Sequence, residues 1–245
     1  MTAIHAAIVT GVSRGLGESL AATLLERGFV VLGVGRASSA RLEGKRYRFA
    51  QIDLGDEASL GAALEPSFRA LADDKPSSAC LINNAAMAGP VGVLGRLNDA
   101  ELASSLAVNL LAPIALANLF CRVFERDGLA RRVINVSSGA AQRPLPGDAM
   151  YCVGKAGLEM LTTALAAEEK GPGFRAITVR PGIIDTDMQA FTRSHSREVL
   201  PCVDMFVEFH SQGRLVPPDT VAAKIVDRLV TAEVDNGRTY SYQEL

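Results

Sequence analysis

The 245-residue chain is poor in the residues that build metal sites and disulfide frameworks. It has no tryptophan, three histidines and four cysteines, and aromatic residues make up only 5% of it. The cysteines lack CxxC spacing and the histidines lack the spacing of metal ligands. Because an apolar chain of this length can bury a core without cross-links, we expect free thiols, a cytoplasmic location and no metal.

An excess of charge of one sign is also missing. The 25 Lys and Arg residues against 27 Asp and Glu residues leave a net charge of −2, which argues against nucleic acid as a partner. A hydrophobic content of 48% excludes intrinsic disorder. The apolar start, Met1–Val9, lacks the charged beginning of a signal peptide and runs into Gly11, so we expect no targeting segment there.

One uncharged stretch, Leu102–Cys121, is about as long as a membrane span. It contains Asn109, Pro113 and Asn118, which are rare inside a bilayer. We therefore interpret it as a pair of buried helices, and we expect no contact with a membrane.

Short apolar runs alternate with longer helical patterns along the chain. The expected strands are Ile4–Thr10, Val30–Val34, Tyr47–Asp53, Ala79–Asn83, Arg132–Ser137, Arg175–Arg180 and Thr239–Tyr242. The expected helices are Leu16–Arg27, Glu57–Leu71, Asp99–Leu110, Ile114–Arg126, Ala149–Glu169 and Thr220–Ala232. This alternation predicts βαβ units, hence a single α/β domain over residues 1–245 with a doubly wound parallel sheet and helices on both faces.

One segment, residues 187–218, breaks the alternation. It contains phenylalanines, two histidines and several prolines, and it follows the end of a strand. We expect a substrate lid here, because loops at strand ends commonly cover binding sites. The alternative is a plain surface excursion.

The first expected strand ends in a glycine-rich turn, Thr10–Gly17. Gly11, Gly15 and Gly17 allow a tight turn, a close approach of the backbone to a pyrophosphate, and close packing of helix on strand. The N-terminus of the following helix offers free N–H groups to phosphates. The spacing is GxxxGxG and not GxGxxG, but its place at the first strand–helix turn predicts a dinucleotide site over an ordinary turn.

The end of the second expected strand predicts which dinucleotide binds. NAD-specific sites place an acid there to hold the ribose 2′-hydroxyl, whereas here Gly35 is followed by Arg36. Arg14 in the first turn can reach the same place, and guanidinium groups match a 2′-phosphate in shape and charge. We therefore predict NADP(H) over NAD(H). The alternative is that either arginine is only a solvated surface charge.

Tyr151 and Lys155 stand four residues apart on an expected helix and therefore share one face. We expect the Lys155 ammonium group and a cationic nicotinamide ring to lower the tyrosine pKa from about 10, which would suit proton transfer at neutral pH. The fifth strand ends in Ser137 and Ser138, and a hydroxyl there can hold a carbonyl oxygen. Asn109 is an amide in an apolar helix and needs a partner. The alternatives are an ordinary amphipathic helix for the pair and a structural role for Asn109.

These motifs, in this order and spacing, resemble the short-chain dehydrogenase/reductase superfamily over essentially the whole chain. Thr10–Gly17 matches the family's TGxxxGxG, and Asn83–Ala86 matches NNAG with an alanine in place of the glycine. The resemblance implies a Rossmann fold with a seven-stranded parallel sheet of strand order 3-2-1-4-5-6-7. It also implies NADP(H)-dependent transfer of hydride to a small-molecule carbonyl substrate.

The resemblance also assigns roles to residues. Ser138 and Tyr151 would polarise the carbonyl group, Tyr151 would donate its proton, Lys155 would orient the ribose, and Asn109 would anchor a water that refills the proton. Asp53 would lie near the adenine. The implied cofactor contacts are Gly11, Ser13, Arg14, Gly15, Leu16, Gly17, Arg36, Asp53, Leu54, Asn84, Ala85, Ala86, Tyr151, Lys155, Pro181, Gly182, Ile184, Thr186 and Met188.

A narrower resemblance, over Pro181–Gln189 and Val216–Tyr242, is to sepiapterin reductases and related bacterial benzil reductases. Sepiapterin reductases carry an acid near the C-terminus that grips the pterin, and Ser241 occupies that place here, which favours a less polar α-dicarbonyl. The alternatives are sepiapterin or a 3-oxoacyl thioester as substrate, and a non-catalytic NADP(H)-sensing module. A transferase that uses a nucleotide methyl donor is a further alternative, against which Arg36 and the tetrad argue. Family members form dimers or tetramers, and we expect a homodimer, with a tetramer as the other possibility.

Overall fold

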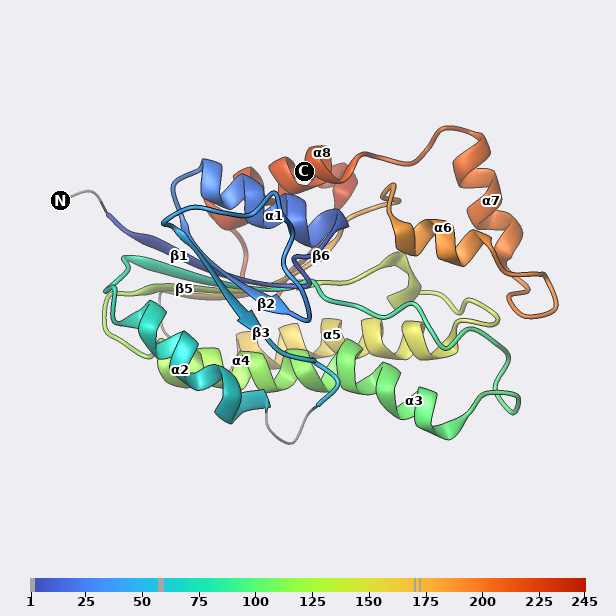
Figure 1. Cartoon of the computed structure of the whole chain (residues 1–245), viewed down its shortest axis with the longest axis horizontal. Helices are drawn as coiled ribbons and strands as arrows, with labels where there is room; N and C mark the ends of the chain where they lie inside the picture. The colour runs from blue at the N-terminus through green and yellow to red at the C-terminus, as the bar shows by residue number, and fades with distance from the viewer. Residues whose placement is uncertain (1–2, 57–59, 170, 172) are drawn as a thin grey trace.

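The structure, a computed structural model, describes residues 3–56, 60–169, 171 and 173–245. Seven parallel strands form one sheet in the order β3-β2-β1-β4-β5-β6-β7, which confirms the expected doubly wound fold (Figure 1). The strands are β1 (His5–Thr10), β2 (Val30–Gly35), β3 (Tyr47–Gln51), β4 (Ser78–Asn83), β5 (Ala130–Val136), β6 (Phe174–Arg180) and β7 (Thr239–Ser241). All six neighbouring pairs are parallel, so the strands end at one common edge.

Helices cover both faces of the sheet because the strands are apolar on both faces. The helices are α1 (Gly15–Glu26), α2 (Leu60–Ala72), α3 (Asp99–Leu106), α4 (Ala112–Val123), α5 (Ala149–Glu168), α6 (Asp187–Arg193), α7 (Val203–Ser211) and α8 (Pro218–Ile225). In β1, Ala7 and Val9 pack in the core formed with α1 and α8, whereas Ala6 and Ile8 pack in the core formed with α2, α4 and α5. Figure 1 shows these two helical layers on either side of the sheet.

One helix differs from the expectation. The sequence predicts two helices with a break before Ile114, but the structure has one continuous helix, Asp99–Val123. A π-helical turn, Ala107–Leu111, joins α3 to α4. Because Pro113 has no N–H and its ring crowds the carbonyl four residues back, the wider turn lets the helix continue past it.

By length and composition alone, helix Asp99–Val123 could cross a membrane, a property that the core helices of soluble proteins share. Leu116, Leu119 and Phe120 of this helix are fully buried in the core beneath the sheet. One face of this helix therefore packs in the core, and 44% of its apolar window is buried.

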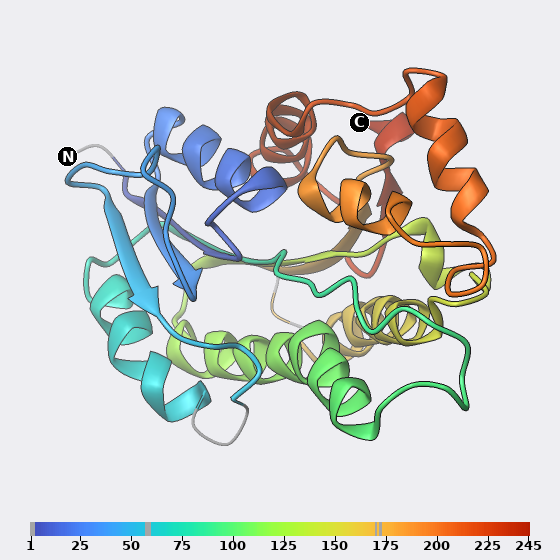
Figure 2. The same ribbon diagram turned by 45° about the vertical axis from the view of Figure 1, so that its right-hand side comes forward.

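The remaining predictions differ only at their ends or in detail. Of the expected helix Glu57–Leu71, residues 57–59 lie outside the described residues, and α2 begins at Leu60. The expected helix Thr220–Ala232 is α8 followed by a π-helical turn, Val226–Val230. The segment 187–218 contains two helices that the sequence analysis did not expect, α6 and α7, which pack on each other at one end of the molecule (Figure 2).

Candidate active site

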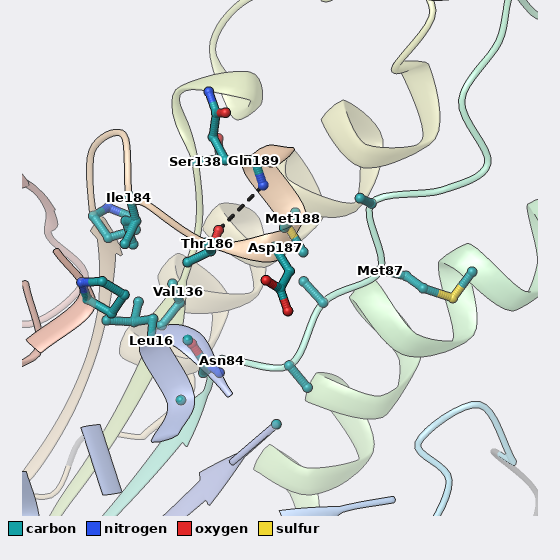
Figure 3. Close-up of a pocket in the computed structure, with 18 of the residues that line it drawn as sticks. Leu16, Asn84, Met87, Val136, Ser138, Ile184, Thr186, Asp187, Met188 and Gln189 are labelled. Atoms are coloured by element: carbon teal, nitrogen blue, oxygen red, sulfur yellow. Dashed lines mark hydrogen bonds between the residues drawn. The ribbon is translucent and has the colours of Figure 1, made fainter. Parts of the chain in front are cut away.

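A cavity of about 1820 Å³ lies along the carboxyl ends of the strands. This is where parallel α/β sheets bind ligands. Every residue predicted to contact the cofactor lines this one cavity, as do Ser138, Tyr151 and Lys155 of the predicted tetrad. Figure 3 shows Leu16, Asn84, Val136 and Thr186 gathered around it from four separate segments of the chain.

The glycine-rich turn has the shape that a pyrophosphate requires. Gly11 and Gly15 have φ of +74° and +61°, in the left-handed region. A Cβ on Gly17 would lie 2.1 Å from the Gly11 carbonyl oxygen and 2.4 Å from Asn84 Nδ2, so only glycine fits there. Asn84 fixes the turn by donating from Nδ2 to the Thr10 carbonyl oxygen over 2.9 Å.

The N-terminus of α1 faces the same cavity. Its N-cap residue, Arg14, makes no side-chain cap hydrogen bond, so the first N–H groups of the helix are not used by a capping side chain. These groups and the helix dipole suit phosphate oxygens. The turn and the helix together therefore fit a dinucleotide.

Six arginines of the described residues line the cavity, and three of them, Arg14, Arg36 and Arg41, lie in or next to the first turns of the nucleotide-binding half of the chain. Arg36 is exposed directly after β2, where the sequence analysis placed the 2′-phosphate. Arg14 Nη1 lies 3.2 Å from Asp187 Oδ2, an ion pair in which both side chains are exposed. Arg41 pairs with Asp219 on α8 over 2.9 Å. Arg41 was not predicted from the sequence, because it lies in the irregular segment after β2 and belongs to no motif.

Lys155 and Tyr151 lie one turn apart on α5, next to the end of β5. Lys155 is 2% exposed, and its ammonium group donates to the Val136 carbonyl oxygen over 2.8 Å. Its Nζ lies 5.4 Å from the centre of the Tyr151 ring. Ser138 follows β5 directly, and its hydroxyl lies close enough to that of Tyr151 to lower the pKa of Tyr151. The structure thus brings three tetrad residues together.

The groups of the protein alone shift the tyrosine pKa upward, and the lowering expected from Lys155 together with a cationic nicotinamide ring stays a prediction. Burial raises the pKa of Tyr151, and the nearby Asp148 carboxyl raises it further, while the hydrogen bond with Ser138 lowers it. Lys155 cannot offset this, because burial disfavours its own charge and lowers its pKa to about 8. Tyr151 therefore holds its proton at neutral pH, as a proton donor must.

Asn109, the fourth tetrad residue, does not line the cavity. Its side chain is 1% exposed and satisfied by protein. Oδ1 accepts from the Met87 backbone N–H over 2.8 Å, and Nδ2 donates to the Met87 carbonyl oxygen and the Ser105 hydroxyl. These bonds give the Asn109 side chain a structural role, which is the alternative stated in the sequence analysis. The anchoring of a relay water by Asn109 stays a prediction.

The Glu159 carboxylate, which was not predicted from the sequence, connects three elements next to the site. Glu159, one turn after Lys155 on α5, accepts from the Ser137 hydroxyl over 2.9 Å and forms a bidentate pair with Arg180 over 2.8 and 2.6 Å. These contacts tie the ends of β5 and β6 to α5. Its spacing of four residues from Lys155 is the one signal that could have suggested it.

Several apolar side chains line part of the cavity. Met188 from α6, Met205, Phe206 and Phe209 from α7, and Leu145 from the loop before α5 line it. Residues of the segment 187–218 thus line the cavity, and the role of this segment as a lid stays a prediction. Its mobility stays a prediction.

Known proteins are similar to this chain in sequence and in structure over most of its length. A family model described as short chain dehydrogenase matches residues 5–197. A benzil reductase that forms (S)-benzoin, from Bacillus cereus, is 33% identical over 245 residues, covering 97% of this chain and 98% of that protein. A sepiapterin reductase from Meriones unguiculatus is 37% identical over 238 residues, covering 91% and 90%. The crystal structure of the KRED1-Pglu enzyme superposes with a TM-score of 0.82 at 26% identity, covering 97% of this chain and 100% of that one.

Proposed function

The chain belongs to the short-chain dehydrogenase/reductase family, and on this basis we propose that it is an NADP(H)-dependent reductase of α-dicarbonyl compounds. The observation that carries the proposal is the convergence of Ser138, Tyr151 and Lys155 with the glycine-rich turn in one cavity. The similarity to benzil and sepiapterin reductases matches the narrower resemblance seen in the sequence.

The cofactor preference rests on charge. Arg36 stands where NAD-specific sites place an acid, and Arg14 and Arg41 line the same cavity. Arg14 and Arg41 are each paired with an exposed acid, whereas Arg36 makes no ion pair with the described residues. Arg36 is therefore the guanidinium we assign to the 2′-phosphate.

The residues of the chain divide the chemistry among them. When bound, the reduced cofactor supplies the hydride. The Ser138 and Tyr151 hydroxyls hold the carbonyl oxygen, and the raised pKa of Tyr151 keeps its proton available for the developing alkoxide. Lys155, held by the Val136 carbonyl, is placed to orient the ribose. The apolar side chains of Met188, Met205, Phe206 and Phe209 in the cavity suit a substrate with aromatic or alkyl groups.

Oxidation of NADPH by the purified protein tests this proposal. The substrates are benzil, 1-phenyl-1,2-propanedione, sepiapterin, an acetoacetyl thioester and a simple ketone, with NADH as the parallel cofactor. We expect the aromatic diketones with NADPH to be the best pair. Turnover of the thioester or sepiapterin alone would contradict the substrate class, and silence across the panel with NADPH bound would favour a non-catalytic sensing role.

A further inference from the structure

A buried carboxyl group without a partner lies at the substrate end of the cavity. Asp148 is 7% exposed and lines the cavity, and its Oδ1 has no hydrogen-bond partner among the described residues. It is the N-cap of α5, where an aspartate usually accepts a backbone hydrogen bond, yet it makes no such bond. Because burial of an unpaired polar group costs free energy, the compensating partner is expected to come with a ligand.

Asp148 is a neighbour of both Tyr151 and the segment 187–218. It precedes Tyr151 by three residues, which places both on one face of the first turn of α5, and its charge raises the pKa of Tyr151. The segment before α7 packs against Gly147, the residue next to Asp148. A Cβ on Gly147 would lie 2.7 Å from the Val199 carbonyl oxygen. The Asp148 carboxylate also raises the pKa of the Cys202 thiol, which shows that the two groups are near each other.

No cation among the described residues pairs with this carboxyl group. The guanidinium of Arg143, on the preceding loop, is exposed and lies 3.4 Å from Met205 Sδ instead. Burial raises the pKa of Asp148 to about 7. The titratable groups that face it have pKa values raised by burial and are uncharged near neutral pH: Tyr151, Cys152 and Cys202. Near neutral pH the protonated acid, a hydrogen-bond donor, is therefore well populated.

Building on the proposed carbonyl reduction, we propose that Asp148 selects vicinal dicarbonyl substrates by donating a hydrogen bond to the carbonyl oxygen next to the one being reduced. Ser138 and Tyr151 hold the reacting oxygen, and the adjacent oxygen needs a donor of its own. Asp148 is one helical turn from Tyr151, whereas the nearby Gln142 is exposed. A simple ketone leaves the Asp148 carboxyl unpaired, and an ionised carboxylate would repel the second oxygen.

The test compares 1-phenyl-1,2-propanedione with propiophenone, which lacks only the second carbonyl oxygen. Asp148→Asn keeps a donor of similar shape, and Asp148→Leu removes it. We expect the ratio of kcat/KM for the diketone to that for the ketone to fall about 10-fold in the Leu variant and to be retained in the Asn variant. An unchanged ratio in the Leu variant would overturn the proposal. So would an equal loss in both variants, which would mean that the site needs a carboxylate as acceptor.

The pH profile gives a readout that a merely structural role would not move. In the wild type the ratio should fall above about pH 7 as Asp148 ionises, whereas in Asp148→Asn it should stay level. A parallel fall in the Asn variant would contradict the proposal. NADPH titration of each variant confirms that it folds. If the wild type reduces neither substrate, the proposed function itself fails. If the wild type reduces both substrates and the ratio of their kcat/KM values is the same in the variants at position 148, only this inference fails.

Discussion

The Lys155 ammonium group donates a hydrogen bond to the Val136 carbonyl oxygen, 2.8 Å away, and is almost fully buried while doing so. The bond links α5 to the end of β5, immediately before Ser137 and Ser138. It holds the amine beside Tyr151, but burial without an anionic partner lowers its pKa to about 8. The lysine therefore acts here mainly as a fixed hydrogen-bond donor.

This burial makes stability depend on pH in a defined direction. The pKa of Lys155 falls from 10.5 to about 8 on folding, so between these values the unfolded chain binds more protons and stability rises with pH. We expect the free energy of unfolding of the wild type to rise relative to Lys155→Met by about 2 kcal/mol between about pH 8 and pH 10. Urea unfolding of both proteins at several pH values measures this, and parallel curves would show that Lys155 is not perturbed.

The glycine-rich turn gives a steric prediction. Gly17→Ala places a Cβ 2.1 Å from the Gly11 carbonyl oxygen, so the turn must open. We expect NADPH binding to weaken at least about 100-fold and the protein to lose about 2 kcal/mol of stability. Gly61→Ala in α2, where a Cβ meets nothing within 4 Å, is the matched control and should leave binding intact. Normal NADPH affinity in Gly17→Ala, measured by fluorescence titration, would place the cofactor elsewhere.

Cofactor preference should depend on Arg36. Arg36→Ser removes the guanidinium assigned to the 2′-phosphate, and we expect the ratio of kcat/KM for NADPH to that for NADH to fall about 10- to 100-fold. Arg96→Ser makes the same change in net charge at an exposed site that does not line the cavity. Equal losses in the two variants would mean that only overall charge matters, and no loss in either would remove Arg36 from the site.

Exposed apolar side chains on neighbouring helices predict the surface of a homodimer. Four such residues are between 39% and 69% exposed: Leu111 at the end of the π-helical turn, Ile114 on α4, and Val153 and Met160 on α5. Met160→Glu should shift the protein from dimer to monomer in light scattering, because a charge in an apolar interface is costly to bury. Val93→Glu, at an exposed apolar residue outside these helices, should leave the dimer intact. A monomeric wild type would contradict the expectation.

The sequence predicts this fold and most of this site because the informative residues lie where strands end. Gly11, Asn84, Ser138 and Thr186 each follow a strand, and parallel pairing brings such positions to one edge. The single helix Asp99–Val123 could not be predicted, because a proline such as Pro113 normally ends a helix. The sequence does not show that a π-helical turn lets the helix continue past it. That turn also holds Asn109, whose side chain bonds the backbone of Met87, 22 residues away.

Properties that depend on burial were the hardest to predict. The direction of the Tyr151 pKa shift follows from how deeply α5 sits, which spacing does not reveal. Asp148 looks like an ordinary N-cap in the sequence. Only the packing of the segment before α7 over Gly147 shows that its carboxyl group is enclosed.

Turnover by Tyr151→Phe tests the central claim most directly. With NADPH and 1-phenyl-1,2-propanedione, we expect kcat to fall by about 10² to 10⁴, because the proton donor is lost while the ring and the cofactor site remain. NADPH affinity, measured on the same sample, should be retained. Turnover equal to that of the wild type would contradict the account, since the cavity would then reduce carbonyl groups without the residue on which its chemistry is built.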